Sequence, residues 1–183
     1  MGTSLCADDY AASPGIATAI ADLLDEGKLS ATTCMTASPH WAPWSRRLLA
    51  HRGRVDLGVH LTLTEREPLG PMPRLAPEGT FPTFRGLSAR LLSGRVSQTE
   101  IEAELHRQLD AFEETLGVLP DFVDGHQHVH QLPIVREAVL RVFTRRLSAH
   151  AFLRVSHERI DLLCARGVSV ARAALIGVPG ARL

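Results

Sequence analysis

Three histidines at alternate positions, just after an aspartate, are the residues of this sequence best suited to chemistry. They lie in the segment Asp124–His130 (DGHQHVH). In an extended segment alternate side chains share a face, so the spacing predicts that all three imidazoles point into one site. Neutral imidazole is the commonest protein ligand for transition metals. The segment therefore predicts a metal site, and a solvated histidine-rich loop is the alternative interpretation.

Two further groups carry residues of the same chemical kind. Asp8 and Asp9 follow a short apolar run, and His60 lies near the end of the apolar stretch Val55–Thr64. One carboxylate and two imidazoles can hold a divalent metal with positions left open for water and substrate, and a second carboxylate supplies a general base. Taken singly, adjacent aspartates are often helix caps and a lone strand histidine is often a hydrogen-bonded core residue.

The composition is that of an ordinary globular protein with balanced charge. Of its 183 residues 45% are apolar and 22% charged, and Lys+Arg and Asp+Glu number 20 each, so nucleic acid and anionic membranes are not expected partners. Cys6, Cys34 and Cys164 are far apart and form no CxxC pair, which fits a cytoplasmic protein without disulfides. Asp8 follows Met1 too closely for a signal peptide, and no apolar run reaches the ~20 residues that span a bilayer.

The elements that must position these residues alternate between strand and helix. The expected order is strand, helix, strand, helix, strand, long loop, helix, strand, helix, strand, helix. This pattern predicts an α/β fold with a parallel sheet, open or closed into a (β/α) barrel, in a single domain over residues 1–183. The catalytic residues are then expected at the carboxyl ends of the strands. The expected strands are residues 5–7, 29–35, 55–64, 122–123 and 152–155, and the expected helices begin near Ser13, Ser45, Ser97, Pro133 and Ile160.

Some segments are predicted with more detail. Ser97 and Glu100 form a capping-box pattern before the clearest helix. The proline- and glycine-rich stretch 65–86 is expected to be an irregular loop that shapes a substrate cleft. Trp41 and Trp44, around a predicted loop at residues 38–43, are interpreted as packing or rim residues. Residues 168–178 are compatible with either a strand or a helix.

Four segments, in the same order along the chain, resemble the YdjC/ChbG-like carbohydrate deacetylases. The resemblance extends over roughly residues 5 to 155, and it includes the helix around residues 104–108 and Pro120. The four segments are Cys6–Tyr10 (CADDY), Leu29–Thr33 (LSATT), Gly58–Thr64 (GVHLTLT) and Asp124–His130 (DGHQHVH).

The resemblance implies a fold, a reaction and a role for each site residue. The implied fold is a distorted (β/α) barrel, and the implied reaction is hydrolysis of the acetyl group of an N-acetylated amino sugar such as a chitooligosaccharide, with a metal-bound water as nucleophile. Asp8 corresponds to the base, and one divalent ion, Mg²⁺ or Zn²⁺, is implied. The corresponding metal ligands are Asp9, His60 and His126, and the corresponding substrate-binding or supporting residues are His128 and His130.

The sequence departs from the family pattern in two ways. Ala11 stands where the family usually has glycine, and a later histidine-proline element is lacking, since the only histidines after His130 are His150 and His157. A closed eight-stranded barrel typically needs ~250 residues, so we expect a barrel incomplete at its C-terminus that associates as a homo-oligomer. A catalytically weak or inactive metal- or sugar-binding relative is one alternative, and a phosphoesterase is another.

Overall fold

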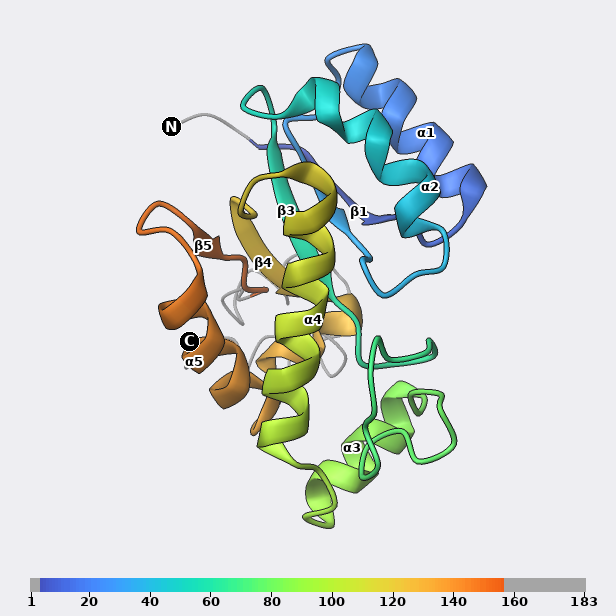
Figure 1. Cartoon of the computed structure of the whole chain (residues 1–183), viewed down its shortest axis with the longest axis vertical. Helices are drawn as coiled ribbons and strands as arrows, with labels where there is room; N and C mark the ends of the chain where they lie inside the picture. Colours follow the sequence, from blue (N-terminus) through green and yellow to red (C-terminus); the bar gives the residue numbers. More distant parts are fainter. Residues whose placement is uncertain (1–3, 157–183) are drawn as a thin grey trace, which may run out of the picture.

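The computed structural model describes residues 4–156 and is built around one parallel sheet (Figure 1). Its strand order, β1-β2-β3-β4-β5, follows the order of the sequence. The strands are β1 (Cys6–Tyr10), β2 (Ala31–Cys34), β3 (Asp56–Leu61), β4 (Phe122–Gly125) and β5 (Phe152–Leu153). The helices are α1 (Pro14–Asp25), α2 (Trp41–Ser45), α3 (Phe84–Leu92), α4 (Gln98–Leu116) and α5 (Val135–Arg146), with 3₁₀ helices η1 (Arg46–His51) and η2 (His126–Gln131).

The parallel sheet confirms the predicted α/β class. Sequential strand order is the arrangement that successive strand–helix units give in a (β/α) barrel. The helix expected near residue 160 and the segment 168–178 lie outside the described residues, and a single domain over 1–183 stays a prediction. Within residues 4–156, no helix is both long enough and apolar enough to cross a membrane.

The helix ends follow the predicted capping chemistry, with one exception. The Ser13 hydroxyl accepts from the Ile16 amide at the start of α1, and Ser97 accepts from the Glu100 amide at the start of α4. Gly117, with φ 68°, ends α4 in the left-handed conformation. The prediction of a full capping box was wrong. The Glu100 carboxylate does not accept from the Ser97 amide but accepts from the Arg74 amide of the long loop.

Two loop predictions also need correction. The irregular stretch ends earlier than predicted, because α3 begins at Phe84 with Thr83 as its N-cap. The second predicted loop is partly helical, since α2 begins at Trp41. The Trp41 ring is buried and stacks on Phe112 with centroids 5.9 Å apart, which confirms its interpretation as a packing residue.

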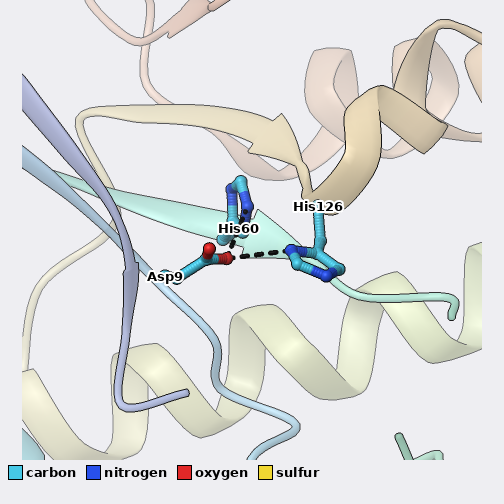
Figure 2. Close-up of side chains that lie close together, drawn as sticks. All are labelled: Asp9, His60 and His126. Carbon is cyan, nitrogen blue, oxygen red and sulfur yellow. Dashed lines mark hydrogen bonds and ion pairs between the residues drawn. The ribbon is translucent and has the colours of Figure 1, made fainter. Parts of the chain in front are cut away.

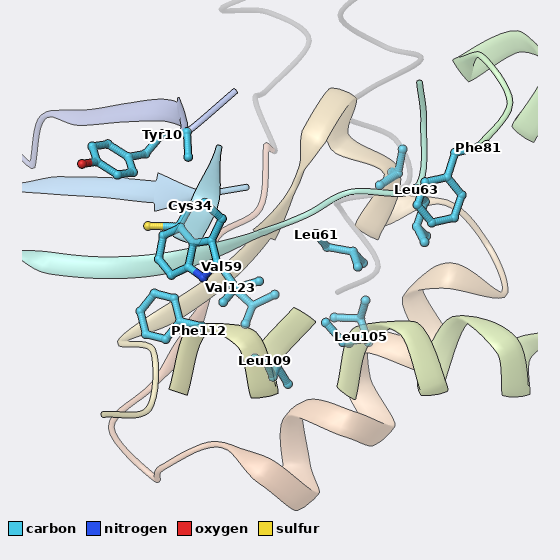
Figure 3. Close-up of a cluster of buried hydrophobic side chains, with 14 of the residues drawn as sticks. Tyr10, Cys34, Val59, Leu61, Leu63, Phe81, Leu105, Leu109, Phe112 and Val123 are labelled. Atoms are coloured by element: carbon cyan, nitrogen blue, oxygen red, sulfur yellow. The ribbon is translucent and has the colours of Figure 1, made fainter. Parts of the chain in front are cut away.

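The alternation of side chains along the sheet separates the core from the site. Figure 3 shows the apolar side of the sheet, where Val59, Leu61 and Val123 meet Leu105 and Leu109 of α4. The residues between them, such as His60 and Asp124, point to the other face because strand side chains alternate. Those two residues are also register partners on adjacent strands. The fold thus places His60 and Asp124 together on the face opposite α4.

Gly58 is required by a side chain of the neighbouring strand rather than by a backbone. A Cβ at Gly58 would lie 2.7 Å from ring atoms of Phe122, whose ring is itself stacked on Phe152. We therefore expect Gly58→Ala to lower the free energy of unfolding by about 1–3 kcal/mol, as overpacked core positions do. Urea unfolding followed by circular dichroism measures this.

The matched control is Gly15→Ala in the exposed first turn of α1. Apart from its chain neighbours and the helix's own backbone, nothing lies within 4 Å of a Cβ at Gly15, so this substitution should leave stability unchanged or raise it by up to about 1 kcal/mol. Equal stability of the two variants would contradict the crowding at Gly58.

Candidate metal centre

Asp9, His60 and His126 come together at the carboxyl ends of β1, β3 and β4 (Figure 2). One potential ligand atom from each residue lies within 4.8 Å of the other two. Asp9 Oδ1 is 2.8 Å from His126 Nδ1 and 3.2 Å from His60 Nε2. Two ligand atoms bound to one ion at about 2.1 Å would lie about 3.0–3.4 Å apart. The Asp9–His60 separation of 3.2 Å is in this range, and the Asp9–His126 separation of 2.8 Å is shorter, so the three residues could hold one divalent cation after a small adjustment of the side chains.

A bulge in β1 directs Asp9 into this cluster. The pairing of β1 with β2 shifts register between Ala7 and Tyr10, and Asp9 has φ 67°. Aspartate tolerates this left-handed conformation, and bulges re-aim side chains next to active sites. The strand was expected to stop before Asp8, but it continues to Tyr10 with both aspartates inside it.

The histidine segment does not continue β4 as an extended strand, so the prediction that its three imidazoles share one face was wrong. After Gly125 the chain turns into η2, and Gln127 and His128 adopt φ values of 52° and 59°. His126 joins the cluster of ligand atoms. His128 Nδ1 instead lies 3.1 Å from Ser156 Oγ, and His130 is buried with 1% of its surface exposed.

Two charged residues that the sequence did not identify as site residues connect the cluster to Asp8. The buried Asp124 carboxylate binds His60 Nδ1 through Oδ1 at 2.6 Å and accepts from Arg154 Nε through Oδ2 at 2.7 Å. Arg154 Nη2 also lies 2.6 Å from Asp8 Oδ1. The alignment of His60 with Asp124 across β3 and β4 could have indicated the first contact. The contact with Arg154 depends on where β5 pairs.

The contacts within the cluster determine the protonation of its members. Hydrogen bonds from His126 and His60 hold the pKa of Asp9 well below its usual range. Burial would lower the pKa of His60, but its hydrogen bonds to Asp124 and Asp9 outweigh burial and raise that pKa to about 9. For Asp124 burial alone would raise the pKa, but the hydrogen bonds and charges of His60 and Arg154 outweigh burial and hold this pKa below its usual value. Cation binding at His60 Nε2 thus requires that nitrogen to lose its proton.

Strained backbone conformations gather around the same cluster. Within the described residues, six residues other than glycine have positive φ, and strained conformations of this kind are typical of functional sites. Ile134 lies at the start of α5. The other five lie in the segments that follow β1, β3 and β4 or in the β1 bulge: Asp9, Ala11, Glu65, Gln127 and His128.

Comparison with known proteins identifies the family. The family model described as YdjC-like protein matches residues 4–178. The chain belongs to the YdjC family. Its relatives include the Mus musculus protein named carbohydrate deacetylase, which is 39% identical over 132 residues, and the Enterobacter sp. (strain 638) protein named chitooligosaccharide deacetylase, which is 32% identical over 163 residues.

The matched regions are only part of these YdjC relatives. The mouse alignment covers 68% of this chain and 41% of the mouse protein, and the Enterobacter alignment covers 87% of this chain and 62% of that protein. A crystal structure from Enterococcus faecalis V583, of a protein named for cellobiose-phosphate cleavage, superimposes with a TM-score of 0.71 at 24% identity. That alignment covers 86% of this chain and 60% of the other, and it supports the fold alone.

Acid sensitivity is the expected consequence of burying His130. Burial lowers the pKa of His130 from 6.5 to about 4. Between these values the unfolded chain binds a proton that the folded chain does not bind, so the free energy of unfolding falls as the pH drops from 6.5 to 4. We expect His130 to contribute about 1–3 kcal/mol of this loss.

Urea unfolding at several pH values tests this contribution with two histidine variants. His130→Gln should lose less stability than the parent protein between pH 6.5 and 4. His150→Gln, at an exposed position, should follow the parent. An unchanged pH dependence in His130→Gln would show that the buried imidazole is not the group responsible.

Proposed function

We propose that this YdjC family chain is a metal-dependent hydrolase that removes the acetyl group from N-acetylated amino sugars of the chitooligosaccharide type. The observation that carries the proposal is the convergence of Asp9, His60 and His126 from three separate strand ends. The names of the mouse and Enterobacter relatives support the reaction and the substrate class.

Asp9, His60 and His126 would hold one divalent ion. When bound, such an ion lowers the pKa of a water molecule and polarises the acetyl carbonyl. Two imidazoles and one carboxylate suit Zn²⁺ by ligand preference, whereas Mg²⁺ is the alternative carried by the family resemblance. Asp124 would keep the His60 ring in place and increase the basicity of Nε2, as carboxylates behind metal-binding histidines do.

Asp8 would accept the proton of the attacking water. Its side chain is 41% exposed, and Arg154 binds its Oδ1 at 2.6 Å. Among the described residues no donor binds Asp8 Oδ2, so this oxygen is available for the proton. The half-buried His128 would contact substrate, whereas the burial of His130 favours a supporting role.

The proposal includes a cytoplasmic location and a homo-oligomeric state. The dispersed cysteines support the location, and Cys6 and Cys34 are both free thiols. Exposed apolar side chains beside the first and last strands of the described sheet support association, since Leu5 and Phe152 are 59% and 46% exposed.

Separate variants of the two adjacent aspartates distinguish base from ligand. We expect Asp8→Asn to reduce acetate release from di-N-acetylchitobiose by about 10²–10⁴-fold, the usual contribution of a general base, with metal affinity largely retained. Asp9→Asn should lose metal binding as well as activity. Enzymatic acetate detection and calorimetric titration with Zn²⁺ and Mg²⁺ measure the two properties.

Asp56→Asn, at the exposed amino end of β3, is the control and should match the parent protein. If the metal-loaded parent releases no acetate from any acetylated amino sugar, the hydrolase proposal is wrong. Metal and sugar binding without turnover would favour a non-catalytic binding protein.

The support of His60 by Asp124 is tested separately. We expect Asp124→Asn to weaken metal binding by about 10–100-fold, because the amide cannot raise the basicity of the imidazole as a carboxylate does. Calorimetric titration against the Asp56→Asn control measures this change. Unaltered affinity would mean that Asp124 serves only the stability of the fold.

A further inference from the structure

Arg154 bridges two carboxylates of the polar face with a single nitrogen atom. Its Nη2 contacts Oδ2 of the buried Asp124 and also lies 2.6 Å from Oδ1 of Asp8. Its Nε donates to the same Asp124 oxygen at 2.7 Å. Among the described residues, none of the three proposed metal ligands forms a hydrogen bond or ion pair with Arg154. Arg154 therefore lies between the proposed base and the buried carboxylate, outside the proposed ligand set.

The guanidinium group is held in place by contacts that do not involve Asp8. The Arg154 amide donates to the Val123 carbonyl of β4 at 3.0 Å, which fixes the start of the side chain. Its Nε binds Asp124, whose carboxylate is in turn held by His60 at 2.6 Å. Because a guanidinium is planar and rigid, these contacts also set the direction of Nη2. Asp8 thus meets a donor whose position is fixed from behind.

Asp8 has few other contacts that could determine its orientation. Its side chain is 41% exposed, and its one further hydrogen bond within residues 4–156 comes from the Cys6 thiol, 3.7 Å from the same Oδ1. A thiol is a weak donor, so Arg154 is the strong partner. The Asp124 carboxylate shares that partner, so without the cation Asp8 would be repelled by a neighbouring like charge. The orientation of Asp8 therefore depends on Arg154.

The position of Arg154 in turn depends on the pairing of β5. This strand has only two residues, and Phe152 at its start stacks on Phe122 of β4 with centroids 4.9 Å apart. The proposed metal ligands come instead from β1, β3 and the end of β4. The ligand set and the orientation of the base are thus supported by different strands. A change at Arg154 can disturb the base while the ligands stay in place.

We propose that Arg154 is a positioning residue for the hydrolysis, which holds Asp8 by Oδ1 and so presents Oδ2 to the attacking water. The inference rests on the proposed function, because that function makes Asp8 the base. In this role Arg154 acts only through Asp8. An arginine that merely compensates the buried charge of Asp124 would be needed equally whether or not residue 8 can accept a proton, so the two roles can be separated.

A double-mutant cycle between Arg154→Lys and Asp8→Asn separates them. Lysine keeps a positive charge beside Asp124, so the fold should be retained, but its flexible point charge cannot fix Asp8 as the planar group does. We expect Arg154→Lys to lower kcat for di-N-acetylchitobiose by about 10–100-fold, with KM and Zn²⁺ affinity within about 3-fold of the parent. In the Asp8→Asn background the same change should lower kcat by less than about 2-fold.

Arg141→Lys is the matched control, because it makes the same change in α5 on a side chain that is 60% exposed. It should behave as the parent protein. The positioning role is refuted if Arg154→Lys leaves kcat unchanged or lowers it equally in both backgrounds. A fall in kcat that only follows a fall in Zn²⁺ affinity would also refute it.

Crystal structures of the parent and of Arg154→Lys, both grown with Zn²⁺, provide a readout that does not need turnover. The parent should show one Asp8 rotamer with Oδ1 on Arg154, and the variant should show a different or divided rotamer. If the parent releases no acetate but the variant reorients Asp8, the positioning stands and only the proposed reaction fails. The same single Asp8 rotamer in both structures would overturn the inference.

Discussion

The buried contact between Asp124 and His60 is the interaction on which the polar face of this sheet depends. A carboxylate removed from water is costly unless charges and hydrogen bonds compensate it, and here His60 and Arg154 do so together. Asp124 lies in β4 and binds one residue from each side of that strand, His60 of β3 and Arg154 directly after β5. Because those partners in turn contact Asp9 and Asp8, this one buried charge connects the ligand cluster to the proposed base.

Regular alternation alone would not have produced this arrangement. The alternation of β3 and β4 places His60 and Asp124 opposite each other on the face away from α4. In β1 the register shift interrupts the alternation that would send adjacent side chains to opposite faces. Both aspartates therefore reach the same polar cluster, where Asp8 contacts Arg154 and Asp9 contacts the two histidines. The site therefore combines two regular strands with one irregular strand.

The sequence predicted the parts of the structure that depend on local pattern. The parallel order, the caps at Ser13 and Ser97 and the convergence of the three candidate ligands all follow from residue type, spacing and family resemblance. The conformation of residues 126–130 was not predictable, because the left-handed turn at Gln127 and His128 overrides the alternation that the spacing suggested. The role of Arg154 was also missed, since it depends on a contact with a residue 146 positions away.

The attachment of the long segment to α4 has a consequence for how the protein opens. Glu100, Glu104 and Gln108 bind backbone groups of residues 62–75 from a helix whose apolar side forms the core. Those backbone amides can exchange their hydrogens with solvent only when the contacts with α4 break. The sequence of this segment is typical of an irregular loop. Its amides at Thr62 and Leu69 should nevertheless exchange slowly, because the segment and the helix would unfold locally as one cooperative unit.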